Sequence, residues 1–276
     1  LTADTLGSKS TALGQGTLAA QNFTTATDAL NVAVGLQAGL SVTTGIRNTL
    51  IGGLTGDALT TGNNNTALGF NALAADTLGD RAVAIGVDAL AAQNFTTTTD
   101  NYNIAIGFQA GAAVSTGVNN TFIGGLAGQD VTTGQFNVFV GTDAGEQVTV
   151  GSSNVAIGRG ALEQDTKGSK TVAIGQGNLN AQNFTTATDS LNTAVGHNAG
   201  VAVTTGVFNT LIGGLAGDAL TDADHNVAVG EDALASDTLG SKSVAIGRTA
   251  LFSQNFTTAT DSLNTAVGYG AGFGVT

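Results

Sequence analysis

The chain of 276 residues contains no cysteine, proline, methionine or tryptophan. The lack of cysteine excludes disulfide bonds and thiolate metal sites. The lack of proline, beside 41 glycines, fits a backbone whose N–H groups are nearly all used in ladders while tight turns recur every few residues. These absences favour a hydrogen-bonded, turn-rich β structure.

Basic residues and long apolar runs are also scarce. Eight Lys and Arg residues against 20 Asp and Glu residues give a net charge of −12, which disfavours nucleic acid as a partner. No apolar run approaches the roughly 18 residues of a membrane span, and residues 1–10 show no secretion-signal pattern. Because the chain begins without methionine, we expect it to be a piece of a longer protein.

One short pattern recurs fifteen times: Thr, Val or Ile, then usually Ala, then Val, Ile or Leu, then Gly. Successive closing glycines are 17 or 21 residues apart, and they are Gly14, Gly35, Gly52, Gly69, Gly86, Gly107, Gly124, Gly141, Gly158, Gly175, Gly196, Gly213, Gly230, Gly247 and Gly268. Such regularity predicts a stacked array. We expect one all-β domain over residues 1–276, a parallel β-solenoid of about 15 turns with 17- or 21-residue repeats.

The copy Asn31-Val32-Ala33-Val34-Gly35 defines five motif positions. Positions two and four share one face of the expected strand, and position three points to the other. Both faces are apolar, which predicts that one lines the interior and the other meets a partner chain. Position three is larger than Ala in four copies, so we expect it to form the oligomer interface. Its predicted residues are Leu50, Phe122, Phe139 and Leu211.

Two further features recur between motifs. An apolar residue at constant spacing after the glycine, such as Val42 or Val114, predicts a return strand, and Thr-Thr-Gly or Ser-Thr-Gly then forms a corner in five turns. Position one is Asn in eleven of fifteen copies. Stacked asparagines can hydrogen-bond along the axis, or each can stabilise its own turn.

The 21-residue spacings share a Gln-Asn-Phe-Thr insertion, which divides the chain into blocks of approximately 1–72, 73–161, 162–233 and an incomplete 234–276. Each insertion is followed by an Asp and preceded by a Lys or Arg at equivalent places. The phenylalanine either packs on a neighbouring turn or is exposed for a sugar to stack on. The second interpretation predicts receptor binding by Phe23, Phe95, Phe184, Phe256, Asn22, Asn94, Asn183 and Asn255.

No catalytic or cofactor constellation emerges. His197 and His225, the only two histidines, have no recurring Ser, Asp or second His at a fixed offset, so no triad or zinc site is predicted. Residues 168–171, Gly-Ser-Lys-Thr, lack the pattern of a phosphate loop. Asp222 and Asp224 form an acidic corner that we interpret as a solvated turn rather than a cation site. We expect no enzyme activity, no cofactor and no metal.

The units Asn192-Thr-Ala-Val-Gly-His-Asn-Ala-Gly200 and Asn264-Thr-Ala-Val-Gly-Tyr-Gly-Ala-Gly272 resemble repeats of bacteriophage tail-fibre-like proteins and, more distantly, the heads of YadA-like trimeric autotransporter adhesins. The resemblance covers essentially the whole chain. It implies a left-handed β-roll, three identical chains around one axis, and an extracellular place in a virion tail fibre that presents lateral loops to a host glycan or protein receptor.

Other functions remain open at this stage. The same repeats fit the head of a bacterial surface adhesin or an extracellular filament subunit, and a flanking membrane anchor would decide for these. Thr44, Thr61, Thr116, Thr133 and Thr205 at equivalent corners suggest an ice-binding solenoid, although Lys or Arg corners and long loops interrupt the threonine row.

Overall fold

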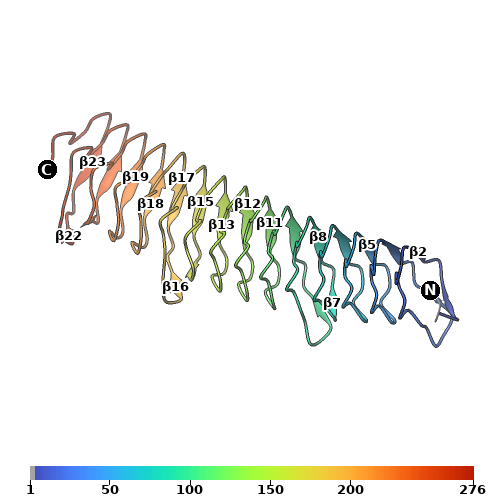
Figure 1. Ribbon diagram of the computed structural model, residues 1–276. Coiled ribbons are helices and arrows are strands. Elements are labelled where there is room, and N and C mark those ends of the chain that lie inside the picture. Colours follow the sequence, from blue (N-terminus) through green and yellow to red (C-terminus); the bar gives the residue numbers. More distant parts are fainter. Residues whose placement is uncertain (1–3) are drawn as a thin grey trace. The chain divides into compact units, whose positions relative to one another are not determined.

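The computed structural model describes residues 4–276, which form an all-β parallel β-solenoid of about 15 turns with no helix among them. By its internal contacts the chain divides into two compact units, the first ending at Phe136 and the second beginning at Asn137. Each unit consists of successive turns of similar outline, with the motif strands on one side and short strands such as β7 and β16 away from them (Figure 1).

Every motif copy forms a strand of three residues. In the first unit these are β2 (Thr11–Leu13), β4 (Val32–Val34), β5 (Thr49–Ile51), β6 (Thr66–Leu68), β8 (Val83–Ile85), β10 (Ile104–Ile106) and β11 (Thr121–Ile123). In the second they are β12 (Val138–Val140), β13 (Val155–Ile157), β15 (Val172–Ile174), β17 (Thr193–Val195), β18 (Thr210–Ile212), β19 (Val227–Val229), β21 (Val244–Ile246) and β23 (Thr265–Val267). Within each unit, successive strands pair in parallel with like motif positions opposite each other, as Ala33 opposite Leu50.

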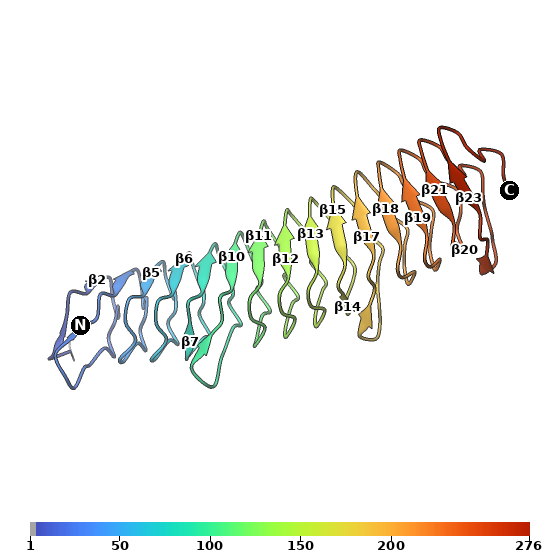
Figure 2. The same cartoon turned by 180° about the vertical axis from the view of Figure 1, so that it is seen from behind.

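The long insertions add short parallel pairs of two residues per strand. In the first unit β1 (Gly7–Ser8) pairs with β3 (Thr27–Asp28) and β7 (Gly79–Asp80) with β9 (Thr99–Asp100). In the second β14 (Gly168–Ser169) pairs with β16 (Thr188–Asp189) and β20 (Gly240–Ser241) with β22 (Thr260–Asp261). The loops beside β7 and β14 project beyond the neighbouring turns (Figure 2).

An ion pair joins the end of each insertion to the preceding turn. Lys170 Nζ lies 2.5 Å from Asp189 Oδ2 across β14 and β16. The corresponding pairs are Lys9–Asp28, Arg81–Asp100 and Lys242–Asp261. The sequence shows these bases and acids at equivalent places without showing that they meet. Because the side chains are about half exposed, each pair contributes little to stability.

The motif glycine is required by backbone geometry. At Gly35 φ is +136°, a conformation that residues with a Cβ rarely adopt. A Cβ there would also lie 2.4 Å from the carbonyl oxygen of Gly52 on the next turn. The glycine therefore allows the backbone to turn sharply after the strand while adjacent turns stay within hydrogen-bonding distance.

Position three faces the interior, so the predicted assignment of the two strand faces is wrong. The four side chains predicted to meet a partner chain, Leu50, Phe122, Phe139 and Leu211, are all 0% exposed. They lie inside the coil of their own chain, and positions two and four point outward instead. The prediction assumed that a thin interior has no room for phenylalanine.

Glycines in the same turn and in the preceding turn provide that room. A Cβ on Gly111 or Gly128 would lie 2.7 or 2.5 Å from ring atoms of Phe122. Each bulky position three has a glycine four residues after its motif glycine, whereas seven turns with Ala at position three carry a buried leucine there, as at Leu90. The core thus exchanges volume between two places within a turn, which keeps packing dense.

The predicted return strand does not form. Val42 and Val114 are buried as expected, but no strand is present at either residue. Positive φ recurs at several places in the turn of Val42, such as Gln37 at +56°, Gly39 at +59° and Arg47 at +58°, and these angles interrupt an extended chain. The residues predicted to form a second strand instead fill the core from a turn.

Asparagine at position one links adjacent turns. Asn48 Nδ2 donates to the carbonyl oxygen of Gly62 at 2.8 Å, and its Oδ1 accepts from the backbone N of Asn65 at 3.0 Å. The same two bonds recur in the second unit. Of the two roles that the sequence left open, bonding along the stack is the one observed.

Candidate functional site

The outward face of the strands is apolar and accessible in the single chain. Position four is occupied only by Val, Ile or Leu, and Leu68, Ile106, Ile123, Ile174 and Ile212 are 36–44% exposed. Position two adds Thr, Val or Ile, mostly half-buried. A strand face exposed to water is normally polar, so a continuous apolar ladder is typical of a contact surface.

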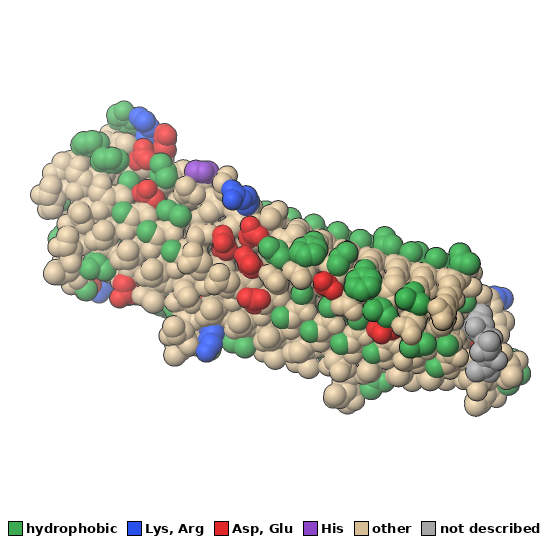
Figure 3. Space-filling model, viewed as in Figure 1, with side chains coloured by type: hydrophobic (Ala, Val, Ile, Leu, Met, Phe, Trp, Pro, Cys, Tyr) green, Lys and Arg blue, Asp and Glu red, His purple; other side chains and the backbone are tan. Residues whose placement is uncertain are grey.

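The residue after the motif glycine extends this apolar face in the first unit. Leu36, Phe70, Val87 and Phe108 occupy that position and are 41–55% exposed. Figure 3 shows hydrophobic side chains gathered over this part of the molecule. In the second unit the same position carries polar residues, among them Arg159, Gln176, His197, Glu231 and Arg248. The two units therefore present different chemistry beside similar strands.

The Gln-Asn-Phe-Thr insertions do not expose their rings as the receptor hypothesis requires. Phe23, Phe95 and Phe184 are only 5% exposed, and the less buried Phe256 lies against Gly240, where a Cβ would be 2.8 Å from its ring. The phenylalanines therefore pack on a neighbouring turn. This contradicts ring stacking on a sugar by these three buried residues.

The asparagines of the same insertions, Asn22, Asn94, Asn183 and Asn255, are exposed. Oδ1 of Asn94 and of Asn183 accepts a hydrogen bond of 3.0 Å from a threonine hydroxyl on the preceding turn. Receptor binding by these four asparagines stays a prediction.

A carboxylate anchors each insertion, and it is buried in three of the four. Asp76 Oδ1 accepts from the backbone N of Gly79 at 3.0 Å and of Phe95 at 3.3 Å, and its Oδ2 accepts from Gln93 Nε2 at 2.6 Å. Gln93 Oε1 in turn accepts from Asn103 Nδ2 at 2.8 Å. The corresponding aspartates are Asp4, Asp165 and Asp237. This network joins the insertion to the asparagine ladder.

Burial raises the pKa of Asp76 and of Asp165, although the hydrogen bonds from the glutamine and from backbone N–H groups oppose this shift. Sequence analysis missed these carboxylates. The signal was present, because Asp76 occupies the place, seven residues after the motif glycine, where Val42 and other apolar residues lie in neighbouring turns. A polar residue in an apolar register position predicts a buried network.

The isolated titratable residues occupy structural positions. The His225 ring stacks on Phe208 with 4.7 Å between centroids. Asp222 Oδ1 accepts from the Thr205 hydroxyl at 2.6 Å, and Asp224 Oδ1 accepts from the backbone N of Val207 at 2.8 Å. Over residues 4–276, no group of three or more His, Cys, Asp or Glu side chains is placed to hold a metal. No helix that could cross a membrane occurs in the same range.

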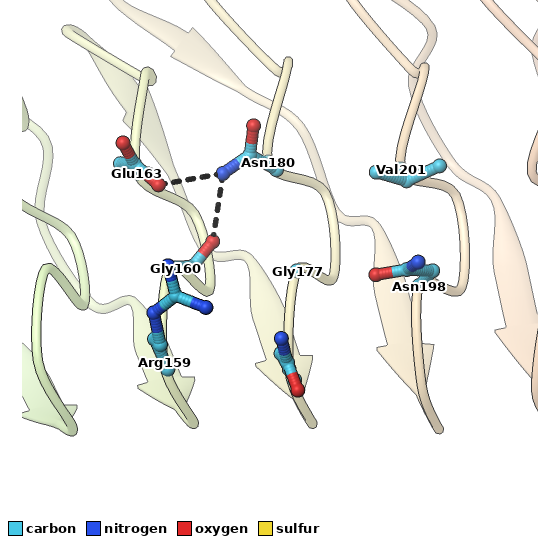
Figure 4. Close-up of a pocket in the computed structure, with 8 residues that line it drawn as sticks. Arg159, Gly160, Glu163, Gly177, Asn180, Asn198 and Val201 are labelled. Carbon is cyan, nitrogen blue, oxygen red and sulfur yellow. Dashed lines mark hydrogen bonds between the residues drawn. The ribbon is translucent and has the colours of Figure 1, made fainter.

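One polar groove is open to solvent in the second unit. It crosses three successive turns and has a volume of about 200 Å³. Its lining residues are Arg159, Gly160, Glu163, Gln176, Gly177, Asn180, Asn198 and Val201. Asn180 Nδ2 donates to Glu163 Oε2 at 2.8 Å and to the carbonyl oxygen of Gly160 at 3.0 Å (Figure 4). Sequence analysis did not single out these residues.

Comparisons with protein families, with curated proteins and with solved structures give no match.

Proposed function

We propose that the chain is a structural and adhesive segment of an extracellular fibre, in which three identical chains associate through their strand faces as a left-handed β-roll with 17- and 21-residue turns. The observation that supports this proposal is the apolar ladder at position four, beside the Thr, Val or Ile of position two. Association removes that ladder from water, which stabilises the assembly.

A second copy of the same chain is the partner that fits this face best. The ladder repeats at the spacing of parallel strands, about 4.8 Å, and only a surface with the same spacing matches it over many turns. Each three-residue strand presents on the order of 50 Å² of this face, so association over many turns is needed to approach the roughly 800 Å² per partner of a standard stable interface. The interface residues of this proposal are those of positions two and four, replacing position three.

Within this proposal, a bacteriophage tail-fibre shaft that presents its lateral loops to a host receptor is the first candidate, because the repeat resemblance extends over the whole chain. The head of a bacterial trimeric adhesin and an extracellular filament subunit use the same architecture and remain the alternative. A membrane anchor encoded beside this segment would favour the alternative, whereas a fibre-chaperone domain would favour the phage fibre.

Sedimentation equilibrium tests the association. We expect three times the mass of one chain for the wild type. The double variant Ile106→Lys/Ile123→Lys places two charges on the strand face and should sediment as a monomer. The matched variant Thr116→Lys/Thr133→Lys adds the same charges at exposed corners of the same turns and should stay trimeric. A monomeric wild type, or equal masses for the two variants, contradicts the proposal.

A further inference from the structure

The groove of the second unit exists because glycine occupies the same position in two consecutive turns and leaves the space of a side chain empty. Gly160 and Gly177 lie two residues after their motif glycines, where the next turn carries Asn198. A Cβ on Gly177 would lie 2.4 Å from Asn198 Oδ1, and one on Gly160 would lie 2.8 Å from Glu163 Oε2. Any larger residue would therefore fill the space between these side chains.

Several polar side chains around the groove have unused hydrogen-bonding capacity. Among residues 4–276, no hydrogen bond or ion pair is formed by the side chains of Arg159, Gln176 or Asn198. Glu163 is held by Asn180 through a single oxygen, Oε2, which leaves Oε1 able to accept. Figure 4 shows Arg159 on one side of Gly160 and the Glu163–Asn180 pair on the other.

The lining chemistry favours a neutral ligand with many hydroxyl groups. The Arg159 guanidinium donates hydrogen bonds, the Glu163 carboxylate accepts them, and each side-chain amide does both. Neighbouring hydroxyl groups of a ligand therefore find both donors and acceptors. A phosphate or carboxylate ligand meets Glu163 and the net charge of −12, which repel it. A metal cation needs several oxygen ligands and would find one carboxylate.

The size of the groove agrees with a small ligand. About 200 Å³ holds about seven waters at the volume that each takes in the liquid, which is a space for one sugar ring. Val201 at one side offers an apolar contact for the C–H groups of such a ring.

We propose that the groove bounded by Arg159, Glu163 and Asn198 binds a neutral saccharide through one of its rings. This inference goes beyond the fibre role, depends on the second unit alone and does not require association of chains. It places the adhesive surface at this groove, whereas the sequence predicted receptor binding at the insertions.

Saturation-transfer-difference NMR on the full chain with a panel of free hexoses and N-acetylhexosamines tests the site. We expect at least one sugar of the panel to bind. Gly177→Asn fills the groove with the residue that the next turn carries at this position, with similar φ values of +68° and +53°, so the fold should be retained. Binding should be lost in this variant and weakened about tenfold in Arg159→Ala, which removes one charged donor.

Asp232→Asn alters the equivalent place on another turn and should leave binding unchanged. The proposal is overturned if no sugar of the panel binds the wild type, or if binding survives both Gly177→Asn and Arg159→Ala. Sedimentation of the same samples separates this result from the fibre proposal, because a monomeric wild type that binds sugar supports the groove and contradicts the trimer.

Discussion

At the scale of single residues, polar side chains inside the coil connect the turns to one another. Asn209 is buried, its Nδ2 donates to the carbonyl oxygen of Ala223 at 2.7 Å, and its Oδ1 accepts from the backbone N of Asn226 at 2.9 Å. Backbone groups buried in this way require a partner, since no water reaches them. The asparagine at position one therefore provides these partners and holds adjacent turns together by hydrogen bonds.

The variant Asn209→Ala should lower the free energy of unfolding by about 2–5 kcal/mol, because it leaves two buried backbone groups without partners. Urea unfolding followed by circular dichroism measures this change. Asn22→Ala removes an exposed asparagine and should shift the same quantity by less than about 0.5 kcal/mol. Equal losses in the two variants would argue against the structural role of the ladder.

The buried carboxylates give stability an unusual dependence on pH. Because burial raises the folded-state pKa of Asp76 and Asp165 above the ordinary value of 3.8, their contribution is fully present below that value. It is lost as pH rises through the raised folded pKa. Asp28 has the opposite effect on the pH dependence of stability, because the hydrogen bond from Lys9 lowers its pKa. The contribution of Asp28 to stability is lost as pH falls.

The double variant Asp76→Asn/Asp165→Asn removes both titrations. We expect the difference in unfolding free energy between the wild type and this variant to decline as pH rises from 3.8 to neutrality. Urea unfolding of both proteins over that range measures the difference. A wild-type advantage that grows with pH would show that the carboxylates titrate below their ordinary value.

At the scale of the element, position three shares interior space with the place four residues after the motif glycine, in its own turn and in the preceding turn. In the turn of Phe122 the aromatic ring takes the space above Gly128, whereas in the turn of Ala84 the side chain of Leu90 takes it. Leu90 adopts φ of +49°, so this backbone conformation accommodates leucine as well as glycine. The two solutions should therefore be interchangeable as pairs.

A double-mutant cycle at these positions measures the exchange. Phe122→Ala alone should cost about 3–5 kcal/mol through the cavity that it leaves, and Gly128→Leu alone should cost about 1–3 kcal/mol through overpacking. The double variant should be more stable than the sum of the two losses predicts by about 1–3 kcal/mol. Additive losses measured by urea unfolding would contradict volume sharing.

At the scale of the whole molecule, each turn contacts only its neighbours within a unit, as in other solenoids. A complete turn can therefore be removed without disturbing the register of the rest. The sequence supports this tolerance to the number of turns. The separation in sequence between Phe95 and Phe184 exceeds that between Phe23 and Phe95 by one 17-residue turn.

Deletion of residues 36–52, which joins Gly35 to Gly53 and removes one whole turn, should leave a cooperatively folded β protein of lower stability. Deletion of residues 36–50 removes two fewer residues and leaves two extra residues directly after Gly35, which displaces the buried positions of that turn from their fixed spacing after the motif glycine, so this protein should be less stable than the whole-turn deletion. Circular dichroism and thermal unfolding compare the two proteins. Similar behaviour of the two deletions contradicts the register requirement.

The sequence by itself determined the stack and its fifteen motif strands, but not the short strand pairs at the insertions. The spacing of Gly35, Gly52 and the other motif glycines sets the turns, and the β-branched residues of the motif predict each strand. The asparagine ladder and the packed insertions were among the alternatives that the residues allowed. These features depend on local sequence or recur in every turn, so each copy of the motif is independent evidence for the same local structure.

Only the tertiary structure decided which face of the strand is inside. Alternation separates position three from positions two and four, but both sets are apolar, so hydrophobicity does not distinguish them. Closure of the coil distinguishes the two faces, because the glycines around Phe122 leave an interior just large enough for the side chains of position three. The groove at Gly160 and Gly177 also depends on closure, since side chains from three turns surround it only when those turns are stacked.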